Sequence, residues 1–200
     1  GIDTVFAGVG RSLGLNQENL VLTGNLAING TGNALDNLIT GNAAANQLSG
    51  GTGADTMIGG LGNDRYYVDN SADVVTETSS LASEIDIVYA SVGHSLGEHV
   101  ERLALTGTNA INGQGNELDN VITGNSASNG LSGGEGDDKL SGKAGNDVLT
   151  GGEGDDTLDG GSGNDVYNID SAGDVIIETS TLATETDSVH TSVSYTLSAN

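Results

Sequence analysis

The chain has 200 residues, no cysteine and no proline, and its 28 acidic residues against five Lys and Arg give a net charge of −23. That charge excludes nucleic-acid binding by phosphate neutralisation, and the lack of cysteine excludes disulfides and thiolate metal sites. No apolar run is long enough to span a membrane. With 33 glycines and few large apolar side chains, we expect the chain to stay largely unfolded until cations neutralise it.

Two nested repeats organise the chain. The longer one places Asp3-Thr4-Val5 again at Asp86-Ile87-Val88 and at Asp187-Ser188-Val189, at intervals of 83 and 101 residues. It predicts five segments: the end of a preceding repeat (1–31), a first nonapeptide block (32–82), an irregular solenoid connector (83–114), a second block (115–180) and the start of the next repeat (181–200). We expect the chain to be a piece of a longer tandem array.

The shorter repeat has nine residues and runs from Gly32 and again from Gly115. Its sixth position is Asn or Asp in all twelve copies: Asn37, Asn46, Asp55, Asp64, Asp73, Asn120, Asn129, Asp138, Asp147, Asp156, Asp165 and Asp174. Its eighth position is apolar or Tyr: Ile39, Leu48, Met57, Tyr66, Val75, Ile122, Leu131, Leu140, Leu149, Leu158, Tyr167 and Ile176. Six turn-forming residues followed by a three-residue strand predict an all-β, parallel β-roll with two nonapeptides per coil.

The roll would stack each sixth-position carboxylate on the one 18 residues later, as in Asp138 with Asp156. Like charges one strand spacing apart repel, so we expect a cation between them. Carboxylates and the carbonyl groups of glycine turns are hard oxygen donors, which favour calcium over magnesium or zinc. Pairs containing an Asn carry one charge fewer and should bind more weakly, and whether Asp3, Asp86 and Asp187 add ligands is left open.

The segments GGEGDDKLS (133–141), GGEGDDTLD (151–159) and GGSGNDVYN (160–168) resemble the RTX (repeats-in-toxin), or haemolysin-type, calcium-binding repeat. The resemblance implies that carbonyl groups of positions 1 to 4 join the sixth-position Asp as ligands. The positions concerned are Gly50, Gly51, Thr52, Gly53, Gly59, Gly60, Leu61, Gly62, Gly133, Gly134, Glu135, Gly136, Gly142, Lys143, Ala144, Gly145, Gly151, Gly152, Glu153, Gly154, Gly160, Gly161, Ser162 and Gly163. Lys143 departs from the family pattern, as do the Asn turns.

The resemblance further implies a secreted or cell-surface bacterial protein, exported by type I secretion and folding on external calcium. We expect a calcium-binding structural or secretion module, with calcium ions and neighbouring repeats as partners and end-to-end self-association through exposed coils. The chain itself offers no nucleophile, base and orienting group together, so we expect no enzyme activity. The alternatives are the tail of a secreted hydrolase or an adhesin segment that binds carbohydrate or a surface.

Overall fold

The computed structural model describes residues 1–180 and 184–196, so residues 181–183 and 197–200 of the expected next repeat lie outside the described part. The chain divides into two compact units: unit 1 contains residues 1–92 and 97–100, and unit 2 contains residues 93–96 and 101–200. The described residues form strands and turns without any helix, so no helix among them could cross a membrane.

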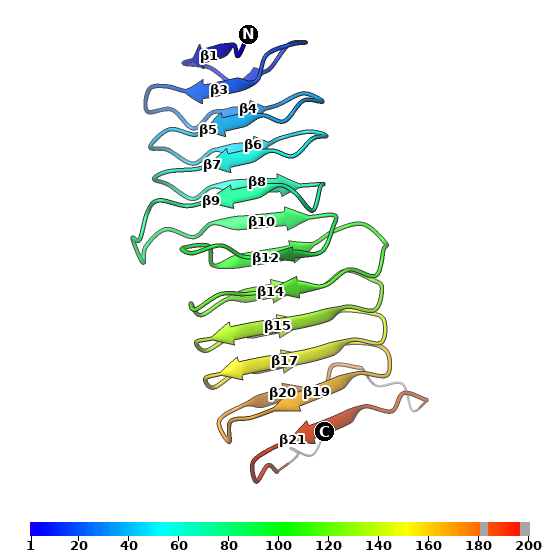
Figure 1. The fold of residues 1–200 in the computed structure, drawn as a ribbon. Helices are drawn as coiled ribbons and strands as arrows, with labels where there is room; N and C mark the ends of the chain where they lie inside the picture. Colours follow the sequence, from blue (N-terminus) through cyan, green and yellow to red (C-terminus); the bar gives the residue numbers. More distant parts are fainter. Residues whose placement is uncertain (181–183, 197–200) are drawn as a thin grey trace. The chain divides into compact units, whose positions relative to one another are not determined.

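Unit 1 is a coil of short strands that alternate between two parallel sheets (Figure 1). One sheet contains β1 (Thr4–Ala7), β3 (Asn19–Leu22), β5 (Leu38–Thr40), β7 (Thr56–Ile58) and β9 (Val74–Thr76). The other contains β2 (Arg11–Ser12), β4 (Asn29–Thr31), β6 (Gln47–Ser49), β8 (Arg65–Val68) and β10 (Ile87–Ala90). Because consecutive strands lie in opposite sheets, each coil of the chain adds one strand to each sheet.

Unit 2 repeats this arrangement with the second block. One sheet contains β12 (Arg102–Leu105), β14 (Val121–Thr123), β16 (Lys139–Ser141), β18 (Thr157–Asp159) and β20 (Val175–Ile177). The other contains β11 (His94–Ser95), β13 (Gly113–Gln114), β15 (Gly130–Glu135), β17 (Val148–Glu153), β19 (Val166–Ile169) and β21 (Ser188–Thr191). The expected all-β parallel β-roll is confirmed in both units.

The strand register follows the nonapeptide spacing inside each block and changes at its borders. Thr56 pairs with Val74 and Leu140 with Leu158, an offset of 18 residues that matches two nonapeptides per coil. Entry to a block adds one residue, since Leu20 pairs with Ile39. Exit adds four, since Tyr66 pairs with Val88 and Tyr167 with Val189. The four extra residues thus enlarge the coil at the end of each block, while the strands of that unit remain paired in parallel.

The core of each unit is a narrow stack of eighth-position side chains between its two sheets. Eleven of the twelve are buried, and Ile176 in β20 is half-buried. The flanking side chains point outward, as the alternation of a strand requires. Each buried Leu, Ile or Tyr contributes on the order of 1.5–3 kcal/mol of hydrophobic stabilisation. With one such residue per nine, this core is thin, and the turns decide whether the roll is stable.

Candidate metal centre

The sixth-position side chains form ladders that link consecutive coils of each unit. In every rung, the backbone N–H of one sixth-position residue donates to Oδ1 of the Asp one coil further on. The N···Oδ1 distance is 2.7 Å from Asn120 to Asp138, 2.8 Å from Asp138 to Asp156 and 3.0 Å from Asp156 to Asp174. The stacking expected at an interval of 18 residues is therefore present, and one oxygen of each carboxylate is occupied.

The second carboxylate oxygen has no hydrogen-bond partner in six of these side chains, although each of the six is at least 99% buried. The six are Asp55, Asp64, Asp138, Asp147, Asp156 and Asp165. A buried, unpaired carboxylate oxygen is costly because it has lost water and gained no donor. These atoms are the strongest indication in the described residues that a cation belongs in the turns.

The surroundings of the unpaired oxygens supply further hard donors. A Cβ placed on Gly133 would overlap Oδ2 of Asp138 and lie 2.6 Å from the carbonyl oxygen of Gly151 in the next coil. The same holds one turn later, where a Cβ on Gly142 would overlap Oδ2 of Asp147 and lie 2.7 Å from the carbonyl oxygen of Gly160. Carboxylate and carbonyl oxygens thus meet beside a glycine that leaves them room. This all-oxygen donor set fits calcium.

Position 2 of the repeat separates two classes of turn, which we call open and closed. In the open turns, position 2 has a positive φ, and Oδ2 of the sixth-position Asp is unpaired. These position-2 residues are Gly51, Gly60, Gly134, Lys143, Gly152 and Gly161. In the closed turns, the N–H of position 2 donates to the sixth-position side chain of the same turn. The six bonds are Asn33 to Asn37, Asn42 to Asn46, Asp69 to Asp73, Asn116 to Asn120, Asn125 to Asn129 and Asp170 to Asp174.

The four Asn residues of the closed turns are also bonded to the preceding coil. Nδ2 of Asn46 donates to the carbonyl oxygen of Ile28 at 2.7 Å, and Nδ2 of Asn129 donates to that of Ile111 at 2.6 Å. The side-chain amide of each Asn thus donates a hydrogen bond to the preceding coil. The expectation of calcium at these Asn turns remains untested, but the Asn side chains are paired within the chain.

The block ends contain two acidic residues, Glu77 and Glu178, that the nonapeptide pattern does not predict as ligands. Asp86 and Asp187 do take the sixth-position place after the four-residue insertion, because their Oδ1 atoms accept from the N–H groups of Asp64 and Asp165. Glu77, however, lies buried beside Tyr66, whose hydroxyl donates to it. Glu178 accepts from Tyr167 in the same way. Tyr66 and Glu77 recur 101 residues later as Tyr167 and Glu178, and this recurrence is the sequence pattern that could have identified the two glutamates.

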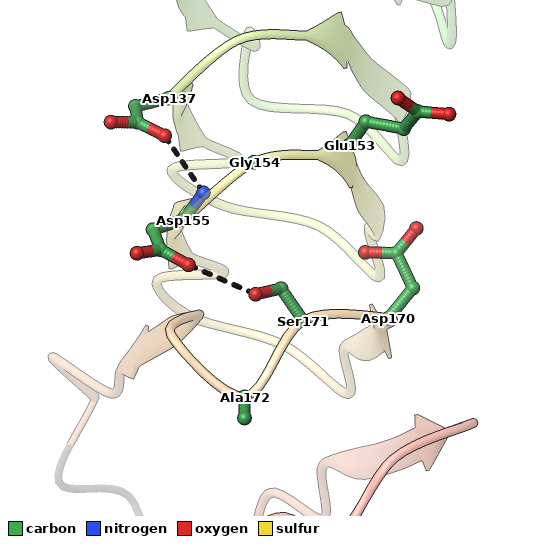
Figure 2. Close-up of a pocket in the computed structure, with 7 residues that line it drawn as sticks. All are labelled: Asp137, Glu153, Gly154, Asp155, Asp170, Ser171 and Ala172. Carbon is green, nitrogen blue, oxygen red and sulfur yellow. Dashed lines mark hydrogen bonds between the residues drawn. The ribbon is translucent and has the colours of Figure 1, made fainter.

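The outer rim of the turns in unit 2 is also acidic (Figure 2). Asp137 accepts from the N–H of Asp155 at 2.8 Å, and the Asp155 side chain accepts from the hydroxyl of Ser171 at 2.9 Å. Glu153 and Asp170 line the same shallow depression and take no part in these two hydrogen bonds. These exposed carboxylates order the rim and give the turn surface a negative potential that attracts cations.

The buried carboxylates of the open turns hold their protons more tightly than free aspartate does. Burial, reinforced by neighbouring carboxylates, raises the pKa to about 7 at Asp64 and Asp138 and to about 6 at Asp55, Asp147 and Asp156. Hydrogen bonds from the preceding coil oppose this effect without cancelling it. A metal ion entering these turns must displace protons at acidic pH.

The stability of the metal-free roll should therefore fall as pH rises from about 4 to about 7. Over that range the folded chain binds more protons than the unfolded chain, whose aspartates ionise near their ordinary pKa of about 3.9. We expect far-UV circular dichroism of the metal-free chain to show more β-structure at pH 4.5 than at pH 8, and calcium to bind more tightly at pH 8. A β-structure content of the metal-free chain that increases with pH would contradict the assignment.

Lys143 tests the requirement for a positive φ at position 2. Its φ is 76°, a conformation that costs a non-glycine residue roughly 1–2 kcal/mol. Lys143→Gly should therefore stabilise the calcium-loaded roll by about 1 kcal/mol. The control Lys139→Gly, in β16 where φ is not positive, should destabilise it by about 0.5–1 kcal/mol. Urea unfolding of both variants would check this, and equal effects would contradict it.

Comparison with known families locates the repeats independently. The family model of the RTX calcium-binding nonapeptide repeat matches in four copies, over residues 31–66, 114–149 and 132–167. Searches of the curated proteins and of the solved structures gave no significant match. The matched residues include all six open turns. The chain therefore carries RTX calcium-binding nonapeptide repeats, folded as a parallel β-roll.

Proposed function

We propose that this chain is a calcium-triggered folding module of a secreted protein, with the six open turns as its principal turn sites. The observation that carries the proposal is the set of six buried carboxylate oxygens without a partner. The ligands in each open turn are Oδ2 of the sixth-position Asp and the turn carbonyl groups beside it. The closed turns bridge coils through hydrogen bonds within the chain and need no ion.

Calcium binding would then be coupled to the folding of the chain. In the unfolded chain the ligands are separated and fully hydrated, so calcium binds the roll far better than the coil. Such a ligand stabilises the folded state by RT ln(1 + [L]/Kd) for each independent site. With a net charge of −23 and a thin core, the chain has little else to offset its conformational entropy.

Calcium-dependent folding would serve the secretion of the chain. Extracellular calcium modules bind in the range of about 10⁻⁴–10⁻³ M, a concentration that external fluids reach. A chain with such sites would remain extended before export and fold outside. The acidic composition, the RTX repeats and the lack of cysteine support this reading, in which the β-roll serves as a structural module without a catalytic role.

The first test is far-UV circular dichroism of the metal-free chain at neutral pH, titrated with CaCl₂ and separately with MgCl₂. Calcium should produce a steep transition from coil to β-structure, and chelation should reverse it. Magnesium should have little effect because it dehydrates reluctantly and the donors are mostly neutral carbonyl oxygens. A spectrum already rich in β-structure without metal, and unchanged by calcium, would overturn the proposal.

A matched pair of variants tests the assignment of individual ligands. Asp156 is buried with an unpaired Oδ2, whereas its neighbour Asp155 is exposed on the outer rim. Asp156→Asn should weaken its site roughly tenfold or more, because it removes the one charged ligand of that turn. Asp155→Asn makes the same change in charge and should barely move the calcium midpoint. Equal shifts in isothermal titration would show that only net charge matters.

A further inference from the structure

The end of the first block gathers carboxylates in a way that the turns do not. Asp64 precedes β8, Glu77 follows β9 and Asp86 precedes β10. All three side chains are buried, and each has an oxygen within 4.8 Å of an oxygen of the others. Among the described residues, this is the one group of three such side chains that is buried throughout.

The unpaired oxygen of Asp64 is directed into this cluster. Asp64 is fully buried, its Oδ1 accepts from the N–H of Asn46 at 2.6 Å, and its Oδ2 has no partner. A Cβ on Gly59 would overlap three atoms at once: Oδ2 of Asp64, Oε1 of Glu77 and the hydroxyl oxygen of Tyr66. Three side-chain oxygens therefore converge on one point, above a glycine whose missing side chain leaves the space.

A more open version of this arrangement recurs 101 residues later, at the end of the second block, where two of the three carboxylates, Glu178 and Asp187, are only half-buried. The three carboxylates there do not form a group within 4.8 Å. The counterparts of Asp64, Tyr66, Glu77 and Asp86 are Asp165, Tyr167, Glu178 and Asp187, and Gly160 corresponds to Gly59. Oδ2 of Asp165 is again buried and unpaired, and a Cβ on Gly160 would overlap it and the Tyr167 hydroxyl. The Tyr167 hydroxyl lies 3.1 Å from Oε2 of Glu178. The residue types, the unpaired Asp oxygen and the Tyr–Glu hydrogen bond therefore recur at the second block end, with the carboxylates further apart.

We propose that each block ends in a second type of divalent-cation site, the cap site, built from side chains. Its ligands are Asp64, Glu77 and Asp86 in unit 1 and Asp165, Glu178 and Asp187 in unit 2, with the Tyr66 or Tyr167 hydroxyl beside the ion. The coil after Asp64 has no glycine turn to offer carbonyl groups, because residues 77–86 read ETSSLASEID. Carboxylates replace them, and an all-oxygen set selects calcium or a similar hard cation.

The cap site should fill before the turn sites. Three carboxylates surround its ion, whereas an open turn supplies one carboxylate and neutral carbonyl oxygens, and oxygen sites bind calcium more tightly as ligand charge increases. We expect its midpoint to lie about tenfold or more below that of the turns. Each cap site uses the unpaired Oδ2 of the last open turn in its block, Asp64 or Asp165. The cap sites therefore take the place of two of the six turn sites, and the other four open turns share no ligand with them.

Terbium, which replaces calcium in oxygen sites and emits when a nearby tyrosine is excited, distinguishes the cap sites from the turns. Tyr66 and Tyr167 lie against the proposed ion, whereas Tyr67 and Tyr89 stack on each other in neighbouring strands. Tyrosine-sensitised emission should appear at the lowest terbium concentrations and should disappear when calcium displaces the terbium.

Glu77→Gln should remove the part of this emission that belongs to unit 1. The double variant Glu77→Gln with Glu178→Gln should remove the high-affinity phase of calcium binding. Glu98→Gln, at an exposed glutamate, is the control for charge and should leave both unchanged.

The outcomes separate the cap sites from the turn sites. If Glu77→Gln and Glu178→Gln bind terbium and calcium as Glu98→Gln does, the cap sites are overturned, and Glu77 serves only as a hydrogen-bond partner of Tyr66. The Asp156→Asn result, in contrast, concerns the turns alone. If Glu77→Gln does not fold in calcium, Tyr66→Phe decides the question, because it keeps all three carboxylates. Calcium binding close to that of the unchanged chain with reduced emission supports the cap site, and unchanged emission overturns it.

Discussion

The two oxygens of each buried carboxylate in the open turns differ in their bonding, and the structure of the roll depends on that difference. Oδ1 is bonded to the preceding coil, which fixes the register at 18 residues and holds the side chain inside the turn. Oδ2 is then buried with no donor available to it. A fold that buries charge in this way is costly without a counter-ion, so the ladder that orders the coils also creates the need for calcium.

The closed turns and the block ends show how the roll begins and ends each run of such turns. A block opens with two Asn turns, whose side-chain amides donate to the coil before them. It ends with Asp73 or Asp174, whose Oδ2 is paired within its own turn. Between them lie the open turns, two in the first block and four in the second, which accumulate charge. The side chains of the Asn turns and of Asp73 and Asp174 are therefore bonded within the chain, whereas the Oδ2 atoms of the open turns are not.

The sequence predicted the ladder and the core because both follow from fixed positions in a nine-residue period. Asp138 and Leu140 could be placed from spacing alone, and the structure puts them in a carboxylate ladder and a core stack. The division into open and closed turns was harder to predict, because Asn and Asp at position 6 look alike while the φ of position 2 decides. Lys143 shows why, since a non-glycine residue there still adopts a positive φ. Glu77 and Glu178 were missed because each stands at the first position of the segment after the last nonapeptide, 18 residues after Gly59 or Gly160, where the repeat predicts a glycine.

The direction of the hydrogen bonds gives the roll a polarity that bears on cooperativity. Each carboxylate accepts from the coil before it, so an aspartate is held in place once the preceding coil is formed. An ion bound in one turn fixes that turn's sixth position, whose own N–H then orients the next carboxylate. Nearest-neighbour coupling of this kind makes a repeat array fold as a linear cooperative system. Because the ligands of each site are partly ordered by its neighbour, binding should spread along a block from coil to coil. The steepness of the calcium transition would then increase with the number of consecutive open turns.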